Sequence, residues 1–180
     1  WAPLPCRFSY CPDSRARSWL CNGRSGCTDL AVPPEDGQTL QIRPAATTVL
    51  WRNGSDGPEV LMGQRGAQAA FMPSKYVFPG GAIDDSDAGL TPAVPLHPLS
   101  ATRLCLNCPP DAPLPNTIAA AALRELWEET GLRLSASQPH QDGLHFIFRA
   151  ITPPGRSRRF DARFFLANAT WVTGDPDDFS

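Results

Sequence analysis

Three of the five glutamates in this 180-residue chain fall within five consecutive positions, as Glu125, Glu128 and Glu129. On an α-helix the first and the last of them are one turn apart, and all three carboxylates can converge on one face. Negative charges packed this closely repel one another, but a divalent cation between them turns the repulsion into attraction. Carboxylate oxygens suit Mg²⁺ or Mn²⁺ far better than zinc. The cluster therefore predicts a magnesium or manganese site.

The helix that carries these glutamates can be delimited from its neighbours in the sequence. Asn116 is a suitable N-cap residue, four alanines fill the next turns, and Gly131 stands where a left-handed C-terminal cap belongs. The apolar stripe that is expected to face the core consists of Ile118, Ala122 and Leu126. This stripe leaves another face of the helix for the carboxylates.

A solvated acidic face is the alternative explanation, because exposed charge is the usual state of glutamate and Arg124 and Arg133 could pair with it. A second motif upstream favours a functional cluster instead. The segment 78–87, Phe-Pro-Gly-Gly-Ala-Ile-Asp-Asp-Ser-Asp, follows a strand-like run. Its paired glycines, Gly80 and Gly81, allow the backbone to turn tightly and to approach a ligand closely.

The two segments together resemble the signature of the Nudix hydrolases, G-x5-E-x7-R-E-U-x-E-E-x-G-U, in which U is an aliphatic residue. The second half matches at every specified position from Arg124 to Leu132, and the first half matches at Gly81. Asp87 stands where the family has glutamate; it is one methylene shorter and could serve as an outer carboxylate. The resemblance implies an α/β fold, a Nudix-type α/β/α sandwich with a mixed sheet.

Five segments have strand-like sequences that fit such a sheet, and turn-forming residues separate the first two and the last two. They are residues 45–52, 59–64, 75–78, 144–151 and 159–166. Because three of these segments precede the helix and two follow it, they match the sheet that the resemblance implies.

The largest departure from the signature is its spacing, because 36 residues separate Asp87 from Arg124 where the pattern has seven. The 29 extra residues, 88–116, are rich in proline and leucine and lack clear periodicity, so we expect a loop. Motif residues fix both of its ends, which places it at the mouth of the active site with an influence on substrate choice; an inert surface loop is the alternative. Together with the segment 64–73, this insertion resembles the peroxisomal coenzyme A diphosphatase branch of the family and its bacterial relatives.

The resemblance implies metal-dependent hydrolysis of a nucleoside diphosphate linked to another moiety, with Mg²⁺ or Mn²⁺ as the cofactor. Coenzyme A or acyl-coenzyme A is the first substrate expected, and ADP-ribose and NADH-type dinucleotides are alternatives. In such a reaction Glu125, Glu128 and Glu129 would bind the metal directly or through water, and the backbone carbonyl of Gly80 or Gly81 would complete the shell.

The remaining site residues are expected to support these metal ligands. Arg124 is expected to orient the glutamates rather than to contact the substrate. Arg65, Lys75 and Arg159 are candidate ligands of substrate phosphates, although arginines more often lie solvated on a surface. The residue that activates water stays open, with the motif glutamates and Asp161 among the candidates.

Domain organisation and cysteine content leave further possibilities open. Residues 39–180 are predicted to form the Nudix domain and residues 1–38 a poorly structured N-terminal segment, and we expect that the carboxyl end of the domain is missing.

Six cysteines are present, and Cys105 and Cys108 have the spacing of half a zinc site. A zinc-stabilised interaction module and a non-catalytic nucleotide-binding module are therefore the other two hypotheses, with free thiols as the default in the cytoplasm.

Composition limits the partners of the protein. A formal net charge of −2 gives no sign of bulk nucleic-acid binding. No apolar run reaches the roughly 20 residues that cross a bilayer. We therefore expect a soluble cytoplasmic enzyme that binds a small-molecule nucleotide, with no nucleic-acid or membrane partner and with its oligomeric state open.

Overall fold

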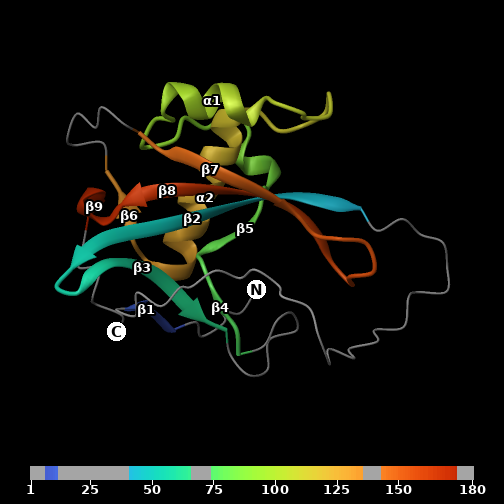
Figure 1. Ribbon diagram of the computed structural model, residues 1–180. Helices are drawn as coiled ribbons and strands as arrows, with labels where there is room; N and C mark the ends of the chain where they lie inside the picture. The colour runs from blue at the N-terminus through green and yellow to red at the C-terminus, as the bar shows by residue number, and fades with distance from the viewer. Residues whose placement is uncertain (1–6, 12–40, 66–73, 136–142, 174–180) are drawn as a thin grey trace.

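The computed structural model describes residues 7–11, 41–65, 74–135 and 143–173, and its main feature is a seven-stranded sheet (Figure 1). The long strands follow the order β1-β3-β2-β8-β7. Their bounds are Arg7–Cys11 for β1, Ile42–Gly54 for β2, Gly57–Gln64 for β3, His145–Ile151 for β7 and Arg159–Asn168 for β8. Apart from β1, the predicted N-terminal segment lies outside the described residues, as do residues 66–73 and 174–180.

The sheet is mixed, as the sequence predicted. β2 and β8 are parallel over ten residue pairs, from Ile42 opposite Arg159 to Trp51 opposite Asn168. The pairs β1–β3, β2–β3 and β7–β8 are antiparallel. All five predicted strands are present with shifted ends, and the predicted third one is reduced to β4 (Tyr76–Val77), which pairs with β3.

Shorter elements complete the described fold. The strand β5 (Gly80–Ala82) pairs with β2, and the 3₁₀ turn η1 (Asp85–Asp87) follows it directly. A separate two-stranded sheet joins β6 (Arg133–Leu134) to β9 (Val172–Thr173), next to the 3₁₀ turn η2 (Ala169–Trp171). The helices are α1 (Pro98–Leu104) and α2 (Pro115–Thr130), and α2 lies behind the sheet in the view of Figure 1.

The helix α2 packs on the sheet through the predicted apolar stripe, whose members Ile118, Ala122 and Leu126 are all buried. The carbonyl of Ala122 also accepts a hydrogen bond of 3.1 Å from the hydroxyl of Thr48 on β2. Gly131 ends the helix in the left-handed region, with φ 74°, as predicted. The predicted N-cap was wrong, because Leu114 holds that position and Pro115 opens the helix. Proline favours this first position because it has no N–H to leave unpaired.

The insertion 88–116 is more ordered than the predicted loop. It contains α1 and the first two residues of α2, and it supplies Val94 and Leu104 to the buried core. Leu96 forms a β-bridge with Leu144, and the hydroxyl of Ser100 accepts a hydrogen bond of 2.8 Å from the N–H of Phe146. The prediction of a loop throughout was therefore wrong, because a helix of two turns is too short to show periodicity.

Removing a core side chain from the insertion is expected to destabilise the whole domain. Leu104 is 4 % exposed, so Leu104→Ala should lower the free energy of unfolding by about 2–4 kcal/mol. The control is Leu106→Ala, because Leu106 lies two residues further on and is 61 % exposed, and a change of less than about 0.5 kcal/mol is expected there. Urea unfolding measures both variants. Equal effects would mean that the insertion does not pack as part of the core.

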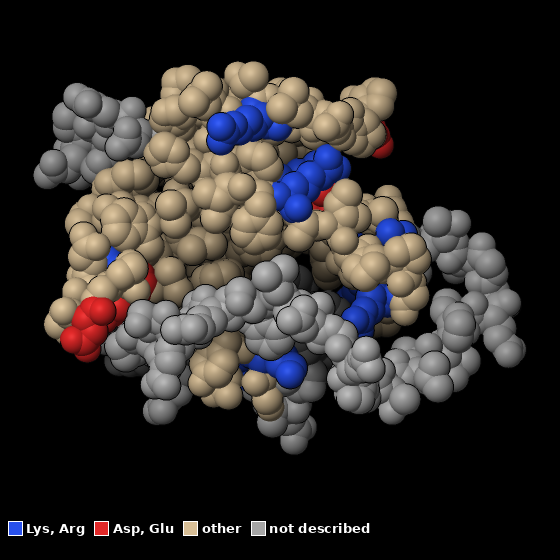
Figure 2. All heavy atoms as spheres, in the orientation of Figure 1, with Lys and Arg blue, Asp and Glu red and all other residues tan. Residues whose placement is uncertain are grey.

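The described Lys and Arg side chains do not form a continuous patch on the face that Figure 2 shows. Among the described residues there, Lys and Arg side chains form several separate groups with neutral residues between them. None of the described helices is long and apolar enough to cross a membrane.

Candidate active site

The strand β5 runs beside the C-terminal half of α2 and brings backbone close to two of the signature glutamates. The N–H of Gly80 donates a hydrogen bond of 3.0 Å to the Glu129 carboxylate. At Gly81, an added Cβ would lie 2.5 Å from the carboxyl carbon of Glu125. Glycine leaves room here for the Glu125 carboxylate, which would have to move if the residue carried a Cβ.

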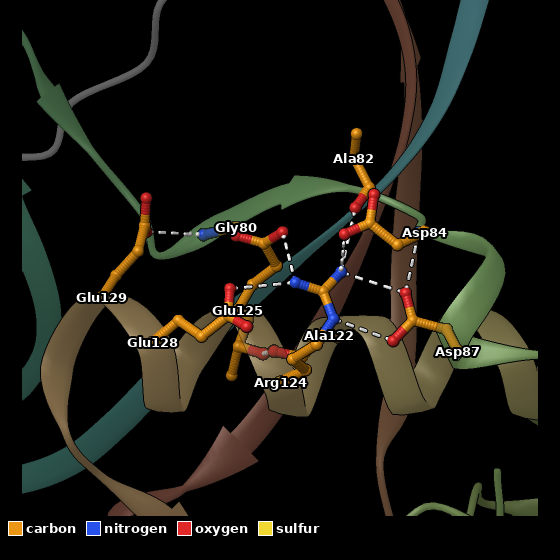
Figure 3. A network of polar contacts seen from close by, with 10 residues as sticks. Gly80, Ala82, Asp84, Asp87, Ala122, Arg124, Glu125, Glu128 and Glu129 are labelled. Carbon is orange, nitrogen blue, oxygen red and sulfur yellow. Dashed lines mark hydrogen bonds and ion pairs between the residues drawn. The ribbon is translucent and has the colours of Figure 1, made fainter. Parts of the chain in front are cut away.

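Arg124 is the centre of the polar network drawn in Figure 3. Its Nη1 donates to Glu125 at 2.9 Å and to Glu128 at 3.0 Å. Its Nη2 donates to the Ala82 carbonyl at 3.1 Å and to Asp87 at 3.0 Å, and its Nε donates to Asp87 at 2.8 Å. These five bonds occupy all five N–H groups of a guanidinium. Arg124 therefore has the geometry of a residue that orients the glutamates, and this role stays a prediction.

Asp87 fixes Arg124 from the opposite side. Its side chain is fully buried, and it accepts from two nitrogens of Arg124 and from the N–H of Asp84 at 2.8 Å. Burial raises the pKa of Asp87, but hydrogen bonds from Arg124 and Asp84, together with the charge of Arg124, outweigh it and lower the pKa below 3.8. Asp87 thus stays ionised, and it lies behind the arginine as an outer carboxylate.

Two of the glutamates have raised pKa values in this arrangement, so their ionised forms are disfavoured. Burial raises the pKa of Glu125, and repulsion from Glu128 and Asp84 adds to the effect, while Arg124 opposes it. Burial also raises the pKa of Glu129 to about 7, assisted by repulsion from Glu125 and Glu128. Two carboxylates whose ionised forms are disfavoured by burial and by like charges are ligands that a cation would stabilise.

The three carboxylates are divided between two hydrogen-bonding partners, and their joint role as metal ligands stays a prediction. Glu125 and Glu128 turn to Arg124, whereas Glu129 turns to Gly80 (Figure 3). Within the described ranges, no three His, Cys, Asp or Glu side chains are grouped so that they could hold one metal ion. Each carboxylate accepts a hydrogen bond from a nearby N–H group, which lowers its energy in this arrangement. The donor chemistry still fits Mg²⁺ or Mn²⁺, with hard oxygens only.

The three predicted phosphate ligands lie in different places. Arg65 is close enough to Glu129 for its charge to oppose the rise in that pKa. Lys75 is exposed and lies beside Arg65. Its backbone carbonyl accepts a hydrogen bond of 3.0 Å from the backbone N–H of Arg65. Arg159 begins β8 opposite Ile42, and its Nε donates to the carbonyl of Thr152 at 3.1 Å. The structure therefore brings Arg65 to the site and gives no contact between Arg159 and the carboxylates.

Sequence reasoning missed Asp84 as a member of the site. Its side chain lies 3.8 Å from Nη2 of Arg124, is 57 % exposed and contributes to the raised pKa of Glu125. An acidic residue three positions before Asp87 matches the spacing of a capping box, and this signal could have identified it.

The cysteine pair of the insertion does not form a site with other described residues. Cys105 and Cys108 are free thiols, and the Sγ of Cys108 donates to the carbonyl of Leu104 at 2.8 Å. The zinc-stabilised module therefore has no group of ligands within the part of the chain that the structure describes.

Adding one methyl group at Gly81 is expected to disturb the site without unfolding the protein. In Gly81→Ala the Glu125 carboxylate must move away, and turnover should fall by about tenfold or more because catalytic groups tolerate little displacement. In Gly80→Ala the Cβ would lie 2.6 Å from the Ala46 carbonyl oxygen and 2.7 Å from the Thr47 Cα, and backbone atoms cannot yield easily. That variant should lose about 1–3 kcal/mol of stability. Kinetics and urea unfolding separate the two effects, and equal destabilisation would contradict this role of Gly81.

Comparisons with known proteins show what the chain is similar to. No known family profile matches the chain. The acyl-coenzyme A diphosphatase NUDT19 of Gallus gallus is 35 % identical over 97 residues, which cover 43 % of this chain and 26 % of that protein. The chain thus spans about a quarter of the length of this curated relative.

Two solved structures are similar in fold. The crystal structure of a NUDIX hydrolase from Alicyclobacillus acidocaldarius has a TM-score of 0.53 and 29 % identity, and the match covers 73 % of this chain and 71 % of that one. The C. elegans Ap4A hydrolase has a TM-score of 0.40 and 18 % identity over 78 % of this chain and 74 % of its own, too little to support an argument. With Glu125 and Glu128 held by Arg124 and Glu129 held by Gly80, the chain is similar to Nudix hydrolases in sequence and in fold.

Proposed function

We propose that this protein hydrolyses the diphosphate of a nucleoside diphosphate linked to another moiety, in a reaction that depends on Mg²⁺ or Mn²⁺. The observation that carries the proposal is the Arg124 network. One guanidinium, fixed by the buried Asp87, holds Glu125 and Glu128 beside β5, and Glu129 is held at the same strand. The similarity to Nudix hydrolases in sequence and in fold supports the same reaction class.

The glutamates would hold the cation directly or through water, with the carbonyl of Gly80 or Gly81 as a further ligand. When bound, a divalent cation neutralises the charge of the diphosphate, which otherwise repels an attacking water. The residues of the chain contribute fixed placement. Because Arg124 positions two carboxylates and the Gly80 N–H a third, little reorganisation is needed when the substrate binds.

Arg65 is the residue that we assign to a substrate phosphate. It lies near Glu129, and its buried Nε has no hydrogen-bond partner among the described residues. A guanidinium in this position offers a positive charge next to the carboxylates, which suits a phosphate group that must approach them.

Coenzyme A or acyl-coenzyme A is the substrate class that we propose first. The similarity to a protein named as an acyl-coenzyme A diphosphatase supports it, as does the insertion between the two halves of the signature. ADP-ribose and NADH-type dinucleotides contain the same diphosphate linkage and are the alternatives.

Turnover is expected to require Mg²⁺ or Mn²⁺, because the three glutamates would otherwise repel a negative diphosphate. Excess chelator should lower the rate by about a hundredfold or more, and added Mg²⁺ should restore it. The measurement is the release of phosphate-terminated products with and without chelator. Full turnover in excess chelator would contradict the proposal.

A panel of diphosphate compounds tests the substrate class. Coenzyme A, an acyl-coenzyme A, ADP-ribose and NADH are each incubated with Mg²⁺ at equal concentration, and products are identified by mass spectrometry. We expect the highest kcat/KM for coenzyme A or its thioester. Faster cleavage of ADP-ribose or NADH would overturn the substrate assignment but keep the reaction class, whereas cleavage of none would overturn the reaction class.

A further inference from the structure

A second polar cluster lies in a pocket at the opposite end of α2 from the glutamates. The pocket is open to solvent, has a volume of about 230 Å³ and is lined by the start of β2, the end of β7, β8 and the insertion segment before α2. Pro113 lines it, two residues before the helix begins. At 1.5 Å per residue, Glu125 and Glu129 lie roughly 15–20 Å further along the helix axis. The pocket shares no lining residue with the carboxylate site.

The polar part of the pocket consists of one carboxylate between two guanidinium groups. Asp161 accepts from Arg149 at 2.6 and 2.7 Å, and Nη2 of Arg163 lies 2.9 Å from the same carboxylate. The side chain of Arg163 is 2 % exposed and that of Asp161 is 13 % exposed. Two positive charges against one negative charge leave an excess of one positive charge. An excess charge in so buried a cluster favours the binding of an anion.

Arg149 is the group that an anion could reach, because its side chain is 24 % exposed. Its Nε and Nη2 each donate one hydrogen bond to Asp161, and its Nη1 donates one to the carbonyl of Asn107 at 3.1 Å. A guanidinium has five N–H donors, so two remain, one on each terminal nitrogen. Neither has an acceptor among the described residues. Arg163 lies behind this group, where it adds positive charge but would not contact the anion.

The remaining walls are mostly apolar and set the size of the ligand. The aliphatic and proline side chains that line the pocket are Ile42, Pro44, Pro109, Pro113 and Ile151. A volume of about 230 Å³ is below the roughly 300–1,000 Å³ of pockets for drug-sized molecules. Asp111 is exposed and also lines the pocket, so its negative charge opposes anion binding, and it opposes ligands with more than one negative charge most strongly.

We propose that this pocket binds a small organic monocarboxylate. Its carboxylate would accept from the two unused N–H groups of Arg149, and its short hydrocarbon body would pack against the proline and isoleucine walls. A single negative charge matches the excess charge of the cluster. A phosphate carries nearly twice this charge and needs more donors than Arg149 offers, and the apolar walls give it nothing to bind.

Hexanoate is a suitable probe, and hexanamide is its neutral counterpart of the same shape. Both are titrated into the full chain while backbone amide signals are followed by NMR. Hexanoate should shift the amides of Ala112 and Arg149 in a saturable way, and hexanamide should bind about tenfold more weakly or worse because it lacks the charge. Equal binding of the two probes, or no saturable shift at these residues, would overturn the proposal.

A negative charge introduced into the pocket tests whether hexanoate binds there. Ala112 is half-buried and lines the pocket, so Ala112→Asp should weaken hexanoate binding about tenfold or more through repulsion. Ala101→Asp, at a half-buried alanine of α1 outside the pocket, is the control and should bind hexanoate as the unmodified chain does. Unchanged binding in Ala112→Asp would overturn the assignment. Tighter binding of inorganic phosphate than of hexanoate would also overturn it, because the pocket would then select phosphate.

Discussion

Replacing Glu129 by glutamine is expected to lower turnover at saturating Mg²⁺ by about a hundredfold or more. The amide has the same size as the carboxylate, and its oxygen can still accept the 3.0 Å hydrogen bond from Gly80. The variant therefore keeps the contact with β5 and loses only the negative charge that we assign to metal binding. Steady-state kinetics over a range of Mg²⁺ concentrations measure the loss in kcat and any shift in the metal requirement.

Glu59→Gln is the matched control for this variant. Glu59 lies on β3, its side chain is 13 % exposed, and it pairs with Arg52 at 2.7 Å, so the same chemical change occurs at a partly buried ion pair outside the site. Turnover in the control should stay within about twofold of the unmodified chain. Near-normal turnover in Glu129→Gln would mean that Glu129 is not an essential ligand.

Stability in chelator shows whether Glu129→Gln keeps the fold. Burial raises the pKa of Glu129 to about 7, above its ordinary value of 4.5, so a proton on this group favours the folded state. This contribution is fully present below pH 4.5 and is lost as the pH rises through 7. Without metal, the glutamine variant should therefore be more stable than the unmodified chain at pH 8 by roughly 1–3 kcal/mol, and the gap should close towards pH 5. Urea unfolding at both values measures it.

The helix α2 was predictable because its signals are local. Helical spacing places the glutamates, and Gly131 marks the end through its own backbone preference. Even the error at the start was local. Pro115 is as clear a signal for the first helical position as Asn116 is for an N-cap, and the structure follows the proline.

The insertion could not be predicted in the same way, because its structure depends on distant partners. Val94 and Leu104 are buried in the core, and Leu96 pairs with Leu144, which is 48 positions away in the sequence. Shortening the insertion to the usual spacing would remove core residues. Its predicted influence on substrate choice stays a prediction, and changes to exposed residues such as Leu106 test it more cleanly.

The role of Asp87 was only partly predictable from the sequence. The signature marks its position, but its shorter side chain and the long insertion that follows left its role as an outer carboxylate open in the sequence. The structure shows that both oxygens of Asp87 reach Arg124 across 37 positions of sequence. Because α1 and the rest of the insertion fold away between them, the added length does not separate the two motif halves in space.

Asp87→Asn is expected to lower the free energy of unfolding by about 2–4 kcal/mol and turnover by about tenfold or more. Asp87 is fully buried, and its two oxygens accept from Nε of Arg124 at 2.8 Å and from Nη2 at 3.0 Å. An amide has one oxygen, so its nitrogen would face an N–H donor, and the guanidinium would lose its buried counter-charge. Arg124 would then hold Glu125 and Glu128 less firmly. Urea unfolding and steady-state kinetics measure the two losses.

The matched control is Asp85→Asn, which makes the same change in the same 3₁₀ turn at an exposed side chain, and it should change stability by less than about 0.5 kcal/mol. The pH dependence identifies the cause. Because the pKa of Asp87 lies below 3.8 in the folded state, its contribution is present above pH 3.8 and is lost as the pH falls through the folded-state value. The deficit of Asp87→Asn should therefore be full at pH 7 and shrink in strong acid. A deficit that is the same at pH 7 and in strong acid would point to packing rather than to the ion pair with Arg124.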